Sequence, residues 1–246
     1  MLSTRTWGTG DPVVLIHGFT QSGRTWEPVA ERLSDVHQVI AVDAPGHGGS
    51  AAVDADLVAG AALIGAAGGR AAYVGYSMGG RFALHLALAR PDLVTRLVLV
   101  SATAGIDDPH QRADRRRADG LIADRLERDG VEVFLRWWLS RPLFATLPAE
   151  ATALDSRLGN TATGLASSLR RAGTGTQAPL WDRLGELSMP VLVVAGELDD
   201  AYLACAHRLV EGIGANATLV AVPGAGHTVH LEAPEVFAAA LEAFLV

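Results

Sequence analysis

The sequence predicts a doubly wound α/β fold, in which helices cover both faces of a mostly parallel sheet. Short apolar runs rich in β-branched residues alternate with helical patterns along most of the chain. Apolarity within these runs is continuous rather than alternating, which is typical of strands buried on both faces. The length of 246 residues and a hydrophobic content of 49% also suit one α/β domain with a substantial core.

The expected elements follow one another in strand–helix order. We expect strands at Val13–Ile16, Val39–Val42, Ala72–Val74, Leu97–Val100, Val191–Ala195 and Thr218–Val222. We expect helices at Trp26–Leu33, Asp54–Gly65, Met78–Ala89, Ala201–Ile213 and Pro234–Leu245. No internal repeat interrupts this order.

Residues 104–187 differ from the rest of the chain. They show helical patterns without a convincing strand, and they include the charged run QRADRRRAD and the aromatic pair Trp137–Trp138. This pattern predicts a helical insertion into an α/β core made of residues 1–103 and 188–246. Since ligands of such folds bind at the carboxyl ends of the strands, an insertion between the fourth and fifth expected strands favours a lid over the site.

Composition restricts the partners of this chain. A formal net charge of −7 gives no general electrostatic reason to bind nucleic acid or an anionic membrane. No run approaches the roughly 20 apolar residues of a membrane span, and the first residues lack the pattern of a signal peptide. The single cysteine, Cys205, favours a reducing compartment. We therefore expect a cytoplasmic protein; the sequence leaves its oligomeric state open.

The stretch GYSMGGR carries the first catalytic signal. Its first five residues, Gly75 to Gly79, match G-x-S-x-G and lie between an expected strand and an expected helix. That context is the one in which a strained strand-to-helix turn presents a nucleophilic serine. The two glycines allow the sharp turn, where larger side chains would collide. Ser77 is therefore the candidate reactive residue.

An acid and a histidine follow Ser77 in the order expected for this fold. A serine hydroxyl becomes reactive when a histidine takes its proton and an acid orients that histidine. The strand MPVLVVAGELDD ends at Asp199 and Asp200, and the strand TLVAVPGAGH ends at His227. Asp199 is favoured as the acid and Asp200 is the alternative, although either could instead cap the helix that follows.

Two backbone amides are candidates for an oxyanion hole. The turn His17-Gly18-Phe19 follows a strand directly, and in this fold such a turn donates one N–H while the residue after the serine donates the other. These amides belong to Phe19 and Met78, and they would stabilise negative charge on a carbonyl or enolate oxygen. His230, three residues after His227, lacks an accompanying carboxylate or cysteine cluster, so we expect no metal site.

Together these motifs resemble the α/β-hydrolase superfamily. HGF, DAPGHGGS, GYSMGG, GELD and PGAGH occur in the order of that superfamily and span most of the chain. The superfamily includes esterases, C–C hydrolases, peroxidases, lyases and inactive binding proteins, so this resemblance alone leaves function open. Few strand-forming residues precede Asp11. We therefore expect the antiparallel strands with which members of this superfamily usually begin to be reduced in this chain.

The insertion resembles that of a narrower family. HQRADRRRADG, FLRWWLSRPLFATLP and SLRRAGTGTQAPLWDRL are similar to segments of the 2-succinyl-6-hydroxy-2,4-cyclohexadiene-1-carboxylate synthases of menaquinone biosynthesis. The resemblance implies a lyase that eliminates pyruvate from 2-succinyl-5-enolpyruvyl-6-hydroxy-3-cyclohexene-1-carboxylate. It further implies that the Ser-His-Asp group acts as a base and that no cofactor is needed.

A substrate with three carboxylates requires local positive charge on a chain of charge −7. All 20 Lys and Arg residues are arginine, so only their positions are informative. Arg81 lies four residues after Ser77 on the same helical face. By resemblance, Arg115 and Arg157 bind the substrate as well, and Tyr76 and Trp138 contact its ring. The alternative for Arg115 is a solvated helix face.

Two other functions remain open from the sequence. A carboxylesterase or C–C hydrolase would use the same Ser77, His227 and acid with water as a co-substrate. A catalytically inactive ligand-binding protein would keep the fold without turnover.

Overall fold

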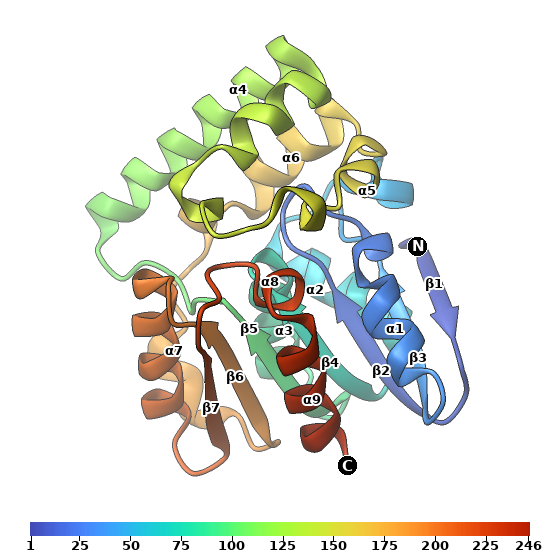
Figure 1. The fold of residues 1–246 in the computed structure, drawn as a ribbon. Helices are drawn as coiled ribbons and strands as arrows, with labels where there is room; N and C mark the ends of the chain where they lie inside the picture. The colour runs from blue at the N-terminus through green and yellow to red at the C-terminus, as the bar shows by residue number, and fades with distance from the viewer.

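The computed structural model describes all 246 residues and shows a seven-stranded, mostly parallel sheet with helices on both faces (Figure 1). The strand order is β1-β3-β2-β4-β5-β6-β7, and only β1 runs antiparallel to its neighbour. The predicted doubly wound α/β fold is confirmed. The strands are β1 Thr4–Trp7, β2 Asp11–Ile16, β3 His37–Val42, β4 Ala71–Tyr76, β5 Val94–Val100, β6 Val191–Gly196 and β7 Ala217–Val222.

The six expected strands are all present, and each extends by one to three residues beyond its apolar run. Polar or small residues at the strand ends complete the ladders; for example, Asp11 pairs with His37 between β2 and β3. Before β2 there is one antiparallel strand of four residues, β1, which pairs with β3. The early strands are thus few and short.

Two apolar layers explain why the strands read as continuously hydrophobic. Along β2, Val13 and Leu15 pack into one cluster with α1 and α9, whereas Val14 and Ile16 pack into another with α2, α3 and α7. Alternate side chains of a strand point to opposite faces, so both faces of this sheet are buried. The covering helices are α1 Glu27–Leu33, α2 Leu57–Gly68, α3 Met78–Ala89, α7 Asp200–Ile213 and α9 Pro234–Leu245.

Three helix starts differ from the prediction. The helix expected from Ala201, α7, begins one residue earlier, at Asp200. The helix expected from Trp26 begins at Glu27, because a 3-10 turn at Gly23–Trp26 precedes it. The helix expected from Asp54 begins at Leu57, because the side chain of Asp56 accepts a hydrogen bond from the backbone N–H of Ala59 and so caps it. The starts of α3 and α9 are as predicted.

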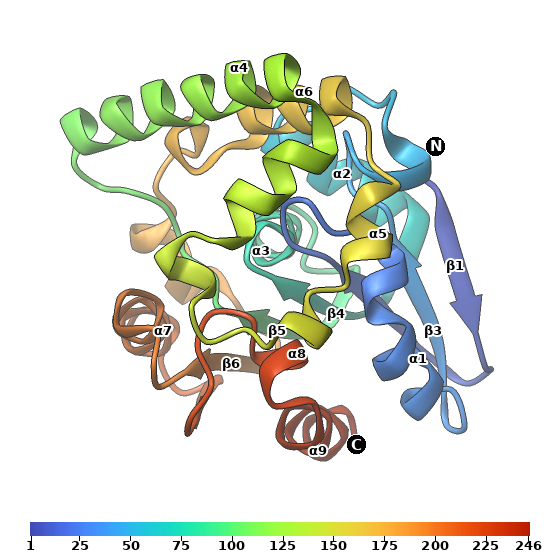
Figure 2. The same cartoon turned by 45° about the horizontal axis from the view of Figure 1, so that its top comes forward.

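The chain between β5 and β6 contains helices and no strand, and α4, α5 and α6 lie above the sheet (Figures 1 and 2). Its main helices are α4 Pro109–Leu139, α5 Leu154–Leu158 and α6 Ala162–Ala172, and α4 is interrupted at Gly130, whose φ is 76°. Apolar residues of α4 and α6 form a third cluster, separate from the two that flank the sheet. We propose that residues 104–187 are a lid over a core of residues 1–103 and 188–246.

No helix combines the length and the apolar character that crossing a membrane would require.

The turn between β4 and α3 depends on close backbone packing at Gly79. A Cβ atom at this position would collide with the backbone oxygens of Ile16 and His17. We therefore expect Gly79→Ala to lower the free energy of unfolding by about 1–3 kcal/mol, measured by urea denaturation.

Gly120 provides the matched control, because it lies within α4 and a Cβ there meets nothing within 4 Å. Gly120→Ala should raise the free energy of unfolding by about 0.5–1 kcal/mol through helix propensity. Equal stability of Gly79→Ala and the unaltered protein would contradict the packing described for this turn.

Candidate active site

Ser77 occupies a strained turn at the carboxyl end of β4. Its φ of 50° and ψ of −107° are unusual for a residue with a side chain, and α3 begins at the next residue. The backbone N–H of Ser77 donates to the carbonyl of Val100 in the neighbouring strand β5. This geometry is the strand–turn–helix arrangement that exposes a serine hydroxyl at the top of a sheet.

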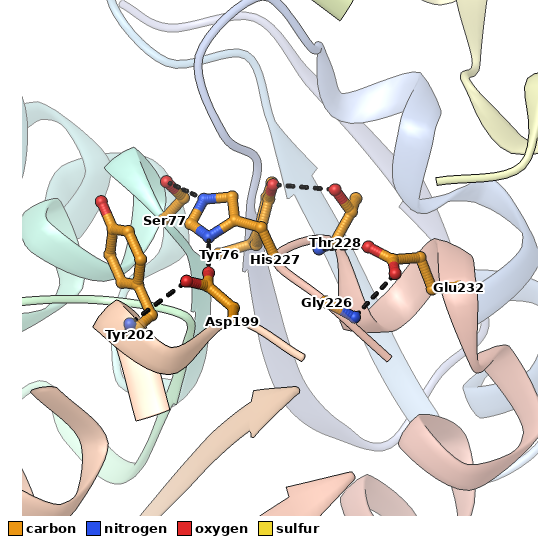
Figure 3. Close-up of polar contacts among 8 residues, drawn as sticks. All are labelled: Tyr76, Ser77, Asp199, Tyr202, Gly226, His227, Thr228 and Glu232. Carbon is orange, nitrogen blue, oxygen red and sulfur yellow. Dashed lines mark hydrogen bonds and ion pairs between the residues drawn. The ribbon is translucent and has the colours of Figure 1, made fainter. Parts of the chain in front are cut away.

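Ser77, His227 and Asp199 form a continuous chain of hydrogen bonds (Figure 3). The Nε2 atom of His227 lies 3.1 Å from Oγ of Ser77, and its Nδ1 atom lies 2.7 Å from Oδ2 of Asp199. The His227 side chain is only 2% exposed. Such an arrangement allows the imidazole to take the proton of Ser77 while the carboxylate fixes the ring and stabilises its charge.

Asp199 both caps the helix that follows it and contacts His227, two roles that the sequence left as alternatives. Its Oδ1 atom accepts a hydrogen bond of 3.3 Å from the N–H of Tyr202 and so caps α7, while Oδ2 contacts His227. Asp200 is exposed and makes neither contact. The structure therefore favours Asp199 over Asp200 as the partner of the histidine.

The two expected oxyanion donors lie beside the serine. Phe19 and Met78 both line the cavity that contains Ser77. Neither of their backbone N–H groups donates to another group of the protein. Both amides are thus available to a ligand oxygen, which is the condition that an oxyanion hole must meet.

A cavity of about 60 Å³ lies above Ser77, between α3, α7 and the helices of the lid. Six of its lining residues were expected at the site: Phe19, Ser77, Met78, Arg81, Arg115 and Trp138. The full lining consists of Phe19, Ser77, Met78, Arg81, Arg115, Trp138, Leu143, Ser168, Leu169, Ala172, Gly173, Thr174 and Tyr202.

Arg81 is a buried cation without a carboxylate partner. It is 6% exposed, and its only side-chain hydrogen bond in the protein runs from Nη1 to the carbonyl of Ala172, at 2.7 Å. Burial lowers the pKa of Arg81 to about 10, so the guanidinium stays charged at neutral pH. Buried charges are normally paired, and this one faces the cavity instead. It is therefore suited to bind an anionic group.

Arg115 reaches the same cavity from α4. Its Nε atom contacts Oδ1 of Asp119 at 2.8 Å, and its side chain is 42% exposed. The other carboxylate oxygen of Asp119 accepts a hydrogen bond from the N–H of Gly175, so Asp119 is shared between Arg115 and this amide. The cavity is therefore lined by one arginine without a carboxylate partner, Arg81, and one whose carboxylate partner is shared, Arg115.

Aromatic side chains from α4 and from the turn after β2 line the cavity. The rings of Phe19 and Trp138 meet edge to face, with centroids 5.4 Å apart. The indole N–H of Trp138 is buried and has no hydrogen-bond partner. A buried donor without a partner is costly, and a ligand acceptor that reached this N–H would remove that cost.

The structure does not bring Arg157 and Tyr76 to this cavity. Arg157 is 1% exposed and donates to the carbonyl of Thr152 and the hydroxyl of Thr20. The hydroxyl of Tyr76 lies 3.3 Å from that of Thr228, on the other side of the His227 ring from Ser77 (Figure 3). Arg157 is one of the largest fully buried side chains, and burial lowers its pKa to about 10. In this structure both residues support the site from outside the cavity.

Sequence reasoning missed several lining residues. Tyr202 follows Asp199 by three residues at the start of α7, so its distance from the acid is the signal that could have indicated it. Ser168, Leu169 and Ala172 lie on one face of α6, but their types carry no chemical signal.

His230 is buried against aromatic rings. Its ring centroid lies 4.5 Å from those of Trp26 and Tyr76, and burial lowers its pKa to about 3. The structure contains no group of three or more His, Cys, Asp or Glu residues that could hold a metal ion.

Comparison with known proteins agrees with this geometry. A family model described as "Alpha/beta hydrolase family" matches residues 13–240. The chain belongs to the alpha/beta hydrolase family.

Within this family, similar proteins carry the name that the insertion predicts. A Bacillus subtilis (strain 168) protein, provisionally named a 2-succinyl-6-hydroxy-2,4-cyclohexadiene-1-carboxylate synthase, is 36% identical over 96% of this chain and 90% of its own length. The synthase of that name from Salmonella schwarzengrund (strain CVM19633) is 33% identical over 90% of this chain and 88% of its own. The resemblance to these synthases is confirmed.

A solved structure leads to the same proteins. MenH from S. aureus superposes with a TM-score of 0.91 at 30% identity, covering 98% of this chain and 97% of that one.

The unpaired charge of Arg81 has a consequence for stability in this alpha/beta hydrolase. Its folded pKa lies below the ordinary value of 12.5, so the charged side chain costs stability at neutral pH, and the cost diminishes as pH rises above about 10. Replacing a buried ion by an apolar side chain of similar size is often stabilising. We expect Arg81→Met to raise the free energy of unfolding by about 1–3 kcal/mol at pH 7, measured by urea denaturation.

Arg170 is the matched control, because it lies on the surface and contacts Asp124 and Glu127 at 2.7 Å. Arg170→Met should leave stability unchanged or lower it by up to about 1 kcal/mol. A loss of stability in Arg81→Met larger than that in Arg170→Met would show that the charge of Arg81 is satisfied within the protein.

Proposed function

We propose that this chain is a carbon–oxygen lyase. It eliminates pyruvate from 2-succinyl-5-enolpyruvyl-6-hydroxy-3-cyclohexene-1-carboxylate and forms 2-succinyl-6-hydroxy-2,4-cyclohexadiene-1-carboxylate. The observation that carries the proposal is the buried, carboxylate-free guanidinium of Arg81 in the same cavity as Ser77. The names of the similar proteins support it.

The substrate matches the charges that line the cavity. It carries carboxylates on the succinyl arm, on the ring and on the enolpyruvyl group. Arginine binds a carboxylate through two parallel N–H donors, and Arg81 and Arg115 present such donors beside Ser77. Arg157 lies outside the cavity, so its expected contact with the substrate stays a proposal that requires the site to rearrange.

The first step is proton abstraction. His227 takes the proton of Ser77, and the serine oxygen removes the proton alpha to the succinyl ketone. Asp199, held 2.7 Å from the imidazole, stabilises the positive charge that His227 gains. The serine thus serves as a base, and no bond forms between enzyme and substrate.

The second step is elimination. The two electrons of the broken C–H bond form an enolate, whose oxygen is stabilised by the N–H groups of Phe19 and Met78. When the ketone re-forms, these electrons move through the ring double bond and break the bond between the ring carbon and the enolpyruvyl oxygen. The released enolpyruvate gains one proton on carbon and becomes pyruvate. One proton is removed and one is returned, so the reaction consumes no water.

The cavity is smaller than its proposed ligand requires. Pockets for small molecules occupy roughly 300–1,000 Å³, whereas the space above Ser77 is about 60 Å³. We propose that α4 and α6 move away from α3 and α7 when substrate enters. Water is then excluded again when they close, which favours elimination over hydrolysis.

The proposed substrate is a small tricarboxylate, and the proposed steps use only side chains and backbone amides of this chain. The single thiol, Cys205, suits a reducing compartment, so we propose a cytoplasmic location.

Pyruvate release tests the proposal directly. Purified protein given the substrate should release pyruvate in step with the absorbance of the conjugated diene product. Ser77→Ala should lose this activity while folding normally by circular dichroism. Rapid turnover of simple esters without pyruvate release would show a hydrolase instead, and binding of the substrate without turnover would show an inactive binding protein.

Asp199 and Asp200 should differ sharply in this assay. Asp199→Asn leaves the imidazole without its carboxylate and favours the wrong tautomer, so we expect kcat to fall by roughly 10³–10⁴-fold. Asp200→Asn is the adjacent, exposed control and should change kcat by less than about twofold. A larger fall in kcat for Asp200→Asn than for Asp199→Asn would show that Asp199 is not the carboxylate that acts with His227.

A further inference from the structure

Tyr202 stands at the boundary between two hollows. It lines the cavity that contains Ser77 and Arg81, and it also lines a wider surface groove of about 510 Å³ beside the start of α4. The two hollows share Arg115, Thr174 and Tyr202. The tyrosine ring therefore closes one side of the cavity above the serine.

The backbone and ring of Tyr202 are held by the catalytic residues. Its N–H donates to Oδ1 of Asp199 at 3.3 Å, and its ring centroid lies 4.4 Å from that of His227. Figure 3 shows the ring beside the imidazole, with its oxygen directed to the side where Ser77 lies. A side chain fixed in this way loses little further freedom when a ligand binds it.

The hydroxyl of Tyr202 makes no hydrogen bond within the protein, although its neighbours are charged. Burial raises the pKa of Tyr202, and the positive charges of Arg115 and Arg81 oppose this rise. The hydroxyl is therefore protonated at neutral pH and can donate. Arginine has no acceptor atom, so neither guanidinium can receive this hydrogen. The acceptor that suits the position is an anionic oxygen placed between the two arginines.

We propose that Tyr202 is a substrate-binding residue whose hydroxyl donates to the carboxylate bound by Arg81 and Arg115. Its ring separates that carboxylate from the outer groove. This inference rests on the proposed function for the identity of the substrate, but the carboxylate contact can be measured without turnover.

The test compares Tyr202→Phe with the unaltered protein in two assays. Phenylalanine keeps the ring against His227 and removes only the hydroxyl. The first assay is calorimetric binding of 2-(3-carboxypropanoyl)benzoate, a stable aromatic dicarboxylate with a succinyl arm and a ring carboxylate. We expect its Kd to rise by roughly tenfold or more, because hydrogen bonds to charged groups are stronger than neutral ones. The second assay is pyruvate release, in which KM should rise similarly and kcat should change by less than about threefold.

Tyr73→Phe is the matched control. The Tyr73 hydroxyl donates to the carbonyl of Gly69 at 2.6 Å and does not line the cavity. Its loss should leave the Kd for the dicarboxylate unchanged. Tyr202→Ala, which removes the ring as well, should lower kcat in addition to raising KM, because the imidazole loses its neighbour.

The outcomes separate this inference from the proposed function. An unchanged Kd in Tyr202→Phe, or no binding of the dicarboxylate to the unaltered protein, would overturn the role of Tyr202. A raised Kd in Tyr202→Phe together with no pyruvate release by the unaltered protein would support the carboxylate contact and reject the lyase. A fall in kcat alone would assign the hydroxyl to the chemistry rather than to binding, and so would also overturn the inference.

Discussion

The hydrogen bond from Arg81 to the carbonyl of Ala172 joins α3, the helix that follows Ser77, to α6. Arg81 lies in the first turn of α3, four residues after Ser77, and Ala172 is the last residue of α6. The final carbonyls of a helix lack partners within it and carry partial negative charge. They can therefore stabilise a buried cation without neutralising it as a carboxylate would. In our proposal, the guanidinium attracts a substrate anion, and the position of α6 determines how enclosed that anion is.

The rest of the site depends on the ends of parallel strands. β4 places Ser77, β6 places Asp199 and β7 leads to His227, so residues far apart in the chain meet at one edge of the sheet (Figures 1 and 3). Asp199 connects this edge to α7 by capping that helix and contacting the imidazole with its other oxygen. The ends of the strands fix Ser77, Asp199 and His227, whereas α4 brings Arg115 and Trp138 to the cavity. In our proposal, residues of the core carry out the reaction, and residues of the lid help to bind a ligand rich in carboxylates.

Local patterns predicted most of the core and the order of its reactive groups. The bounds of α3 and α9 could be predicted because their apolar periodicity begins at a clear turn or proline. The start of α2 could not be predicted from the local pattern. It depends on whether the side chain of Asp54 or that of Asp56 reaches a backbone N–H and caps the helix. Arg157 and Tyr76 were expected at the ligand, but their placement is decided by long-range packing that no local pattern encodes. Tyr202 was missed for the converse reason, since an isolated tyrosine near a helix start is ordinary until its neighbours are known.

We propose that Ser77 is a base beside a carboxylate held by Arg81, and a crystal structure of the Ser77→Ala protein with the intact substrate tests this arrangement. We expect carboxylate oxygens within hydrogen-bond distance of Arg81 and Arg115, the ketone oxygen at the N–H groups of Phe19 and Met78, and the alpha carbon facing residue 77. A substrate whose carboxylates point into solvent, with its carbonyl carbon over residue 77 in position for nucleophilic attack, would show that Ser77 is a nucleophile and that Arg81 does not bind the substrate.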